Sequence, residues 1–98
     1  MIYLTLFLAG ALVCNALPHL TSGLRGETFF TPWSRPRGTG RSSAVENVLW
    51  GSANLFVGVF LLTHRLGENI PHGLLAVAAG FLCAGCGIAM IFSRRLRD

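Results

Sequence analysis

Three long apolar stretches, residues 1–17, 44–63 and 70–93, most strongly constrain what this chain can fold into. Each has about the length that an α-helix needs to cross the hydrocarbon core of a bilayer, near 20 residues with a lower limit of about 17. No Arg or Lys falls within any of them. A water-soluble chain of 98 residues has too small an interior to bury three such stretches. The sequence therefore predicts an all-α integral membrane protein, a bundle of three transmembrane helices.

The distribution of positive charge predicts an orientation. All eight basic residues are Arg, a bias that suggests a GC-rich bacterial genome. Four lie between the first two stretches, three follow the third, and one lies between the second and third. With three spans, the first group of four arginines and the last group of three lie on the same side of the membrane. The positive-inside rule makes that side cytoplasmic. We therefore expect a multi-pass protein of the bacterial inner membrane, N-terminus out and C-terminus in, whose charge contacts the lipid bilayer and no nucleic acid.

Local signals predict where the spans begin and end. No basic residue precedes Arg25, so the first stretch lacks the n-region of a signal peptide and should be retained as a helix that Pro18 ends. Ser43 and Glu46 form a capping-box pattern at the start of the second helix, and Pro71 suits the first turn of the third. The prediction is a single membrane domain with spans at about 1–18, 44–63 and 70–93, a loop at 19–43, an outer turn at 64–69 and a basic tail at 94–98.

The second and third stretches each carry a stripe suited to contacts between helices. The stripe on the second includes two amides, and an amide without a partner is costly in hydrocarbon, so it should face protein. The stripe on the third consists of small residues at spacings of three and four, which let helix backbones approach closely. The predicted helix-contact residues are Asn47, Gly51, Asn54 and Gly58 on the second helix and Gly73, Gly80, Ala84 and Gly87 on the third. Thr5, Ala9, Leu12 and Ala16 form a weaker matching line on the first.

A polar cluster is expected where the first helix ends and the second begins. Asn15 and His19 close the first span, and Glu46, Asn47 and Trp50 open the second, so they share one depth. A His near a carboxylate can relay protons or bind a cation or headgroup. We favour capping and hydrogen bonds between helices over such a functional site.

A second candidate lies in the glycine-rich segment before the second helix. Arg37 and Arg41 flank Gly38-Thr39-Gly40, and a helix N-terminus can attract phosphate. The segment lacks the G-K-[ST] ending of a P-loop, so a lipid phosphate is the alternative to a solvated linker and a nucleotide is not expected.

The cysteines do not form a catalytic or metal-binding pattern. Cys83 and Cys86 are spaced as C-x-x-C, but they lie in the middle of an apolar helix, where a thiol is not activated. Cys14 lies on another helix, and packing is the favoured role for all three. With no catalytic constellation, the sequence predicts no enzyme activity, no cofactor and no metal.

These observations predict a non-catalytic accessory or structural subunit that packs against other membrane helices, either in a larger membrane protein complex or in copies of itself. Three helices that meet on small residues fill their own centre, so one chain encloses no water-filled path. The alternative is a homo-oligomeric transporter or channel for a small solute or ion, gated by Asn47, Asn54, His19 and Glu46. A redox carrier using Cys83 and Cys86 is the third interpretation.

Overall fold

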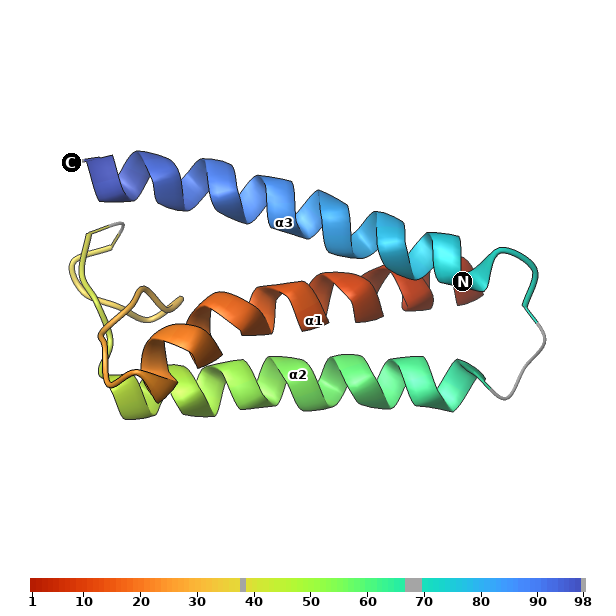
Figure 1. Ribbon diagram of the computed structural model, residues 1–98, viewed down its shortest axis with the longest axis horizontal. Helices are drawn as coiled ribbons and strands as arrows, with labels where there is room; N and C mark the ends of the chain where they lie inside the picture. Colours follow the sequence, from red (N-terminus) through yellow and green to blue (C-terminus); the bar gives the residue numbers. More distant parts are fainter. Residues whose placement is uncertain (38, 67–69, 98) are drawn as a thin grey trace.

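The computed structural model describes residues 1–37, 39–66 and 70–97, which form three α-helices (Figure 1). α1 spans Ile2–Leu24, α2 spans Ala44–Leu66 and α3 spans Gly73–Arg97. At 1.5 Å per residue these helices are about 35–38 Å long, which exceeds the bilayer hydrocarbon core of about 30 Å. All three are long and apolar enough to cross a membrane, which confirms the predicted all-α class.

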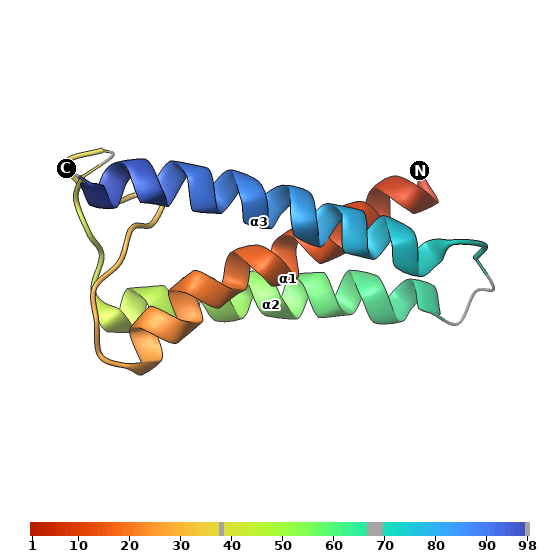
Figure 2. The same ribbon diagram turned by 45° about the horizontal axis from the view of Figure 1, so that its top comes forward.

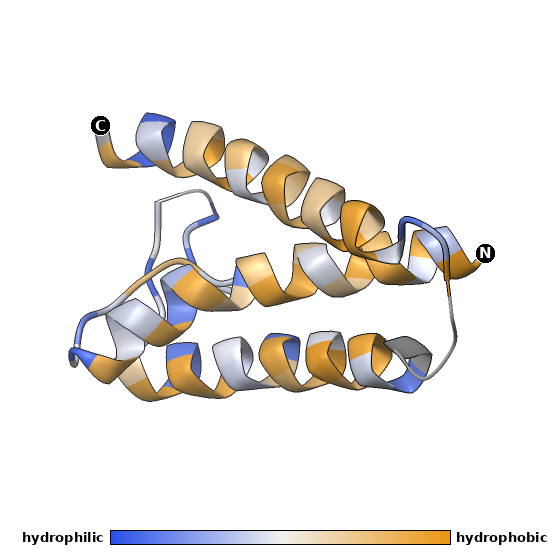
Figure 3. Cartoon of the chain, turned by 45° about the vertical axis from the view of Figure 1, so that its right-hand side comes forward, coloured by the Kyte–Doolittle hydropathy of each residue, from blue (hydrophilic) through white to orange (hydrophobic). Residues whose placement is uncertain are grey.

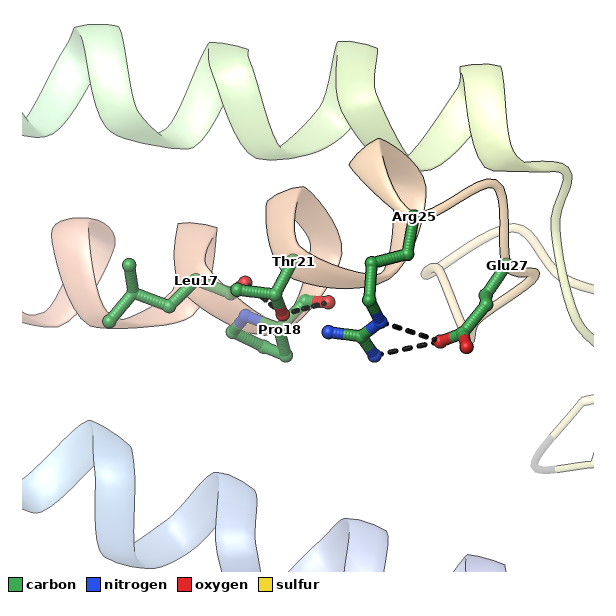
Figure 4. Close-up of polar contacts among 5 residues, drawn as sticks. All are labelled: Leu17, Pro18, Thr21, Arg25 and Glu27. Carbon is green, nitrogen blue, oxygen red and sulfur yellow. Dashed lines mark hydrogen bonds and ion pairs between the residues drawn. The ribbon is translucent and has the colours of Figure 1, made fainter.

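The first helix does not end at Pro18, contrary to the sequence prediction, and residues 19–24 extend it. A proline inside a helix cannot donate to the carbonyl one turn earlier, and its ring crowds that carbonyl. The helical turn around Pro18 is stabilised by Thr21, whose Oγ1 donates hydrogen bonds to Leu17 O at 2.8 Å and Pro18 O at 3.2 Å (Figure 4). Buried Ser22 and Gly23 lie in the final turn. The free energy gained by burying the last turn therefore outweighs the free energy that Pro18 costs inside the helix.

Gly26 is the actual stop signal of α1. Its φ of 75° is left-handed, a conformation that glycine adopts without the steric cost of a side chain. Gly26 N donates to Gly23 O, and Glu27 N donates to Ser22 O, each at 2.9 Å. These two bonds form the Schellman motif, which satisfies the last carbonyls of the helix.

The capping box at the start of α2 is confirmed. Glu46 Oε1 accepts a hydrogen bond from Ser43 N at 2.9 Å, and Ser43 Oγ accepts one from Glu46 N at 3.1 Å. Each side chain thus satisfies a backbone N–H group that the helix itself leaves free. The helix begins at Ala44 as predicted and continues to Leu66, three residues beyond the predicted end.

The third helix is shifted from its predicted range of 70–93. It begins at Gly73, so Pro71 precedes the helix and does not lie in its first turn. His72 has a left-handed φ of 57°, which separates Pro71 from the helix. At the other end the helix continues through Arg94 and Arg95 to Arg97, so most of the predicted tail is helical. Residues 67–69 of the predicted outer turn lie outside the described residues.

The amide and glycine stripe of α2 faces α1. Asn47 is 0% exposed and Asn54 is 6% exposed, and Ala9 and Ala16 of α1 are fully buried. A Cβ added to Gly51 would lie 3.1 Å from Ala16 O, and one added to Gly58 would lie 3.1 Å from Ala9 O. These glycines therefore allow the backbones of α1 and α2 to approach closely.

A pair of glycines marks the crossing of α1 and α3. A side chain on Gly80 would collide with the backbone of Phe7, and one on Gly10 would collide with the backbone of Val77. Gly73 is farther away, 3.4 Å from Leu6 Cδ1, and Ala84 is half-buried. Gly87, which the sequence placed in the same stripe, has nothing within 4 Å of an added Cβ. The contact face of α3 therefore turns away from the predicted stripe beyond Ala84.

The helices do not close into a bundle, because α1 lies between the other two (Figure 1) and runs obliquely from α3 at its N-terminus to α2 at its C-terminus (Figure 2). Within the described residues, α2 and α3 make no close backbone contact with each other. From the crossing at Gly10 and Gly80, α1 and α3 diverge toward the C-terminal end of α3 (Figure 1). The expected three-helix bundle is therefore an open row of helices.

The predicted charge clusters lie at one end of the molecule. The segment between α1 and α2 and the C-terminus of α3 lie together, opposite the N-terminus and the α2–α3 connection (Figure 1). We call this the loop end. Apolar residues dominate the helices, and many of the hydrophilic ones lie near their ends (Figure 3).

Candidate functional site: a cavity at the loop end

The segment between α1 and α2 is built around a buried cluster of hydroxyl groups. Phe29 and Ser42 pair as an antiparallel bridge, with Ser42 N donating to Phe29 O at 2.7 Å. Ser34 Oγ lies 3.0 Å from Thr31 Oγ1 and 2.9 Å from Ser42 Oγ, and all three side chains are buried. Apart from this isolated bridge, the described part of the segment has no regular secondary structure beyond the end of α1, as its composition predicts, and it folds against the helices.

Asn47 joins that segment to α1 and α2. Its Nδ2 donates to Phe29 O, Ser42 O and Ser43 O at 3.0–3.2 Å. Its Oδ1 lies 2.8 Å from His19 Nδ1, and His19 is only 3% exposed. One amide thus satisfies buried groups from three parts of the chain, which explains why it tolerates complete burial.

A second pair of amides, Asn15 and Asn54, links α1 and α2. Asn15 Nδ2 donates to Asn54 Oδ1 at 3.0 Å, and Asn54 Nδ2 donates to Trp50 O at 2.8 Å. The polar cluster predicted from the sequence is therefore partly assembled, with Asn15, His19, Asn47 and Trp50 at one level. Glu46 does not join it, because its carboxylate binds Ser43 N and accepts a hydrogen bond from Trp33 Nε1 at 2.8 Å. Among the described contacts, Glu46 and His19 share no hydrogen bond.

A cavity of about 370 Å³, here called the interfacial cavity, opens beside this cluster. Its volume lies within the range of about 300–1,000 Å³ that is usual for sites of small molecules. Asn15, His19 and Trp50 line one side, and Ile88, Ile91 and Phe92 of α3 line another. The cavity exists because α3 diverges from α1 at this end, and the segment between α1 and α2 fills only part of the gap.

Aromatic rings and arginines form the outer wall of the interfacial cavity. Phe30 and Phe92 stack with ring centroids 5.5 Å apart, and the guanidinium of Arg95 lies 5.3 Å from the centre of the Phe30 ring. Arg37 and Arg95 both line the cavity. Such cation–π contacts hold a guanidinium in place without neutralising its charge. The cavity therefore combines an apolar wall with two cationic groups.

Neither arginine in the lining forms an ion pair with an acid in the described part of the chain. Glu27 pairs with Arg25 at 2.7 Å, and this contact holds the pKa of the Glu27 carboxyl below its usual range (Figure 4). Glu46 is engaged by Ser43 and Trp33, as described above. Within the described residues, the charge of Arg37 and Arg95 thus remains available to a ligand.

Arg37 and Arg41, the candidate phosphate-binding arginines of the sequence analysis, do not line the same cavity. Arg41 lines a separate hollow, which Ser22 and Thr28 also line. Its guanidinium lies 5.2 Å from the centre of the Phe30 ring. The cation that shares the interfacial cavity with Arg37 is Arg95, which lies in the predicted basic tail. Gly38 lies outside the described residues.

The cysteines stay apart from this site. Cys14 is buried between α1 and α3, where an added Cβ on Gly85 would lie 3.2 Å from its Sγ, and Cys83 and Cys86 are exposed on α3. In the described ranges no three His, Cys, Asp or Glu side chains are close enough to hold a metal ion.

Five residues that line the cavity were not predicted from the sequence: Phe30, Thr31, Ser34, Phe92 and Arg95. The sequence has an aromatic run at 29–33, but composition alone gives no sign that this run folds back against α3. The signal that could have located it is the presence of Asn47, a buried amide at the start of a helix, which needs acceptors from a neighbouring segment.

Comparison with known proteins adds no identity to this geometry: no family model matches the sequence, and no curated protein and no solved structure shows significant similarity to it.

Proposed function

We propose that this chain is a non-catalytic, multi-pass protein of the bacterial inner membrane that binds an amphiphilic molecule in the interfacial cavity. The observation that carries the proposal is the composition of that cavity, with isoleucine and phenylalanine side chains on one wall and two arginines at the rim. An acyl chain gains free energy from the apolar wall, and an anionic group gains it from the arginines.

The membrane location is supported by the three apolar helices and by the arginine distribution. Arg25, Arg35, Arg37, Arg41 and the arginines of α3 lie at the loop end, and the positive-inside rule favours the cytoplasm for that end. We expect a fluorescent-protein reporter fused after residue 98 to fluoresce in the cytoplasm. A periplasmic enzyme reporter that is active at the same position would contradict this orientation.

The amphiphile proposal is tested by filling the cavity. Ile88 lines it, so Ile88→Trp should occupy part of the space that a ligand needs. Leu82→Trp is the matched control, because Leu82 is 64% exposed on the same helix and does not line the cavity. In native mass spectrometry after mild extraction, wild type and Leu82→Trp should retain a lipid-sized adduct, and Ile88→Trp should lose it. Equal retention by all three proteins, or by none, would contradict the proposal.

A second candidate function is the accessory subunit predicted from the helix faces. It is favoured by α3, which packs against α1 but makes no close backbone contact with α2 within the described chain, and on which Leu82 and Met90 are exposed and a Cβ added to Gly87 would meet nothing within 4 Å. Extraction in mild detergent followed by mass determination should then recover a complex with a larger membrane protein. A homo-oligomer would favour the transporter or channel, because a single chain with α1 at its centre encloses no path. A monomer would contradict both.

A further inference from the structure

His19 is the buried polar group in the interfacial cavity whose hydrogen-bonding capacity is only half used. It is 3% exposed and lines the cavity. Its Nδ1 contacts Asn47 Oδ1, and Nε2 has no hydrogen-bond partner among the described residues. A buried polar atom without a partner is costly, so the free nitrogen points to a missing ligand group.

The surroundings of Asn47 determine which kind of group is missing. Its Nδ2 faces three carbonyl oxygens, which only accept hydrogen bonds, so the orientation of the amide is fixed. The oxygen Oδ1 therefore faces His19, and His19 Nδ1 must be the donor in that contact. In a neutral imidazole the other nitrogen, Nε2, is then an acceptor.

The charges around His19 favour the neutral ring. Arg37 and Arg95 line the same cavity, and the ring's polar partner is the uncharged Asn47. Both described acids already have partners: Glu27 binds Arg25, and Glu46 accepts hydrogen bonds from Ser43 N and Trp33 Nε1. A third positive charge beside two guanidinium groups, without a carboxylate to offset it, is unfavourable.

We propose that the interfacial cavity selects an anionic phosphodiester lipid whose headgroup carries a free hydroxyl group. Arg95 and Arg37 bind the phosphate, and the headgroup hydroxyl donates its hydrogen bond to His19 Nε2. The acyl chain lies against Ile88 and Ile91. This inference rests on the proposed amphiphile site and adds the chemistry of the headgroup. A headgroup ammonium is disfavoured beside the two arginines.

The test compares lipids that differ in one feature at a time. Delipidated protein in non-ionic detergent is titrated with phosphatidylglycerol or with phosphatidylmethanol, which has the same phosphodiester charge but no hydroxyl group. Native mass spectrometry measures the apparent Kd. We expect phosphatidylglycerol to bind about tenfold more tightly, the worth of one buried hydrogen bond to a group otherwise left unpaired. Equal binding would overturn the headgroup inference.

Two variants locate the effect. His19→Asn keeps an amide donor close to the position of Nδ1 and removes Nε2, so it should bind both lipids with equal affinity. Arg95→Gln should weaken both by about tenfold. Arg94→Gln is the control, because Arg94 is exposed and does not line the cavity, and it should bind like wild type. A full tenfold preference retained by His19→Asn, or no difference between Arg95→Gln and Arg94→Gln, would overturn the inference.

The remaining outcomes separate this inference from the proposed function. If Ile88→Trp abolishes binding of both lipids while wild type binds them equally, the amphiphile site stands and the headgroup chemistry is wrong. If Ile88→Trp leaves binding of phosphatidylglycerol unchanged, both proposals fail. Soluble glycerol phosphate is the last arm, and binding as tight as that of phosphatidylglycerol would show that the acyl chain contributes nothing and would overturn the lipid assignment.

Discussion

At the scale of single residues, two buried amides organise the loop end. Asn47 satisfies three backbone carbonyls and His19, and Asn54 links Asn15 to the backbone of α2. In a low-dielectric environment the loss of any of these hydrogen bonds costs free energy, because the buried group left without a partner cannot bind water instead. Asn47 thus ties the segment between α1 and α2 to both helices through hydrogen bonds.

Replacement of Asn47 tests this dependence. Asn47→Ala removes the amide that joins His19, Phe29 O and Ser42 O, so the folded protein should lose about 2–3 kcal/mol of stability. The measurement is the midpoint of thermal unfolding in detergent. Ser52→Ala, on the same helix and without a side-chain hydrogen bond in the described chain, should shift the midpoint little. Equal shifts for the two variants would show that Asn47 does not hold the segment.

At the scale of helices, close backbone approach decides the packing. Gly51 and Gly58 set the distance between α1 and α2, and Gly10 and Gly80 set the crossing of α1 and α3. Because α3 is held near that crossing, its C-terminal half diverges from α1 and leaves room for the interfacial cavity. The shape of the site is therefore a consequence of where these glycines lie.

The crossing is tested by a matched pair of glycine substitutions on α3. Gly80→Ala places a methyl group against the backbone of Phe7, so it should destabilise the protein by about 1–3 kcal/mol. Gly87→Ala meets nothing within 4 Å and should be neutral or slightly stabilising, because alanine favours the helix by about 1 kcal/mol. Thermal unfolding of the two variants side by side measures the difference. A larger loss for Gly87→Ala would mean that α3 packs through another face.

Periodicity and capping signals predicted most of the elements but not all of their ends. The capping box of Ser43 and Glu46 is a local interaction, so the start of α2 was predicted to the residue. The predicted end of α1 at Pro18 is wrong, because local sequence does not encode the tertiary contacts that keep the helix intact beyond it. The helix ends before Gly26, whose left-handed φ stops it.

The candidate site was predicted only in part, for a related physical reason. Asn15, His19, Asn47 and Trp50 lie on helices at predictable positions, so helical periodicity brought them to one level. Phe30 and Arg95 join them through contacts between segments more than 60 residues apart in the chain, and no local pattern encodes such a contact. The prediction that Gly87 of α3 contacts another helix is wrong, because small residues mark a possible contact face and not an actual one.

At the scale of the whole molecule, the row of three helices presents a large apolar surface and one strongly basic end. Leu49, Phe56 and Phe60 of α2 and Leu74, Leu75 and Leu82 of α3 are all exposed. In water this surface would drive aggregation, and in a bilayer it faces acyl chains. The basic end then lies at the level of anionic headgroups, which is where the interfacial cavity opens.

The most direct test of this account is the depth of the two tryptophans in a bilayer. Trp33 lies in the segment that connects α1 to α2, and Trp50 lies in the second turn of α2. Their ring centroids are 5.4 Å apart at the loop end. The protein is reconstituted in vesicles whose lipids carry bromine at different positions of the acyl chain, and tryptophan fluorescence is measured. The account predicts the strongest quenching by bromines nearest the glycerol. Absence of quenching, or the strongest quenching by bromines at the chain ends, would contradict it.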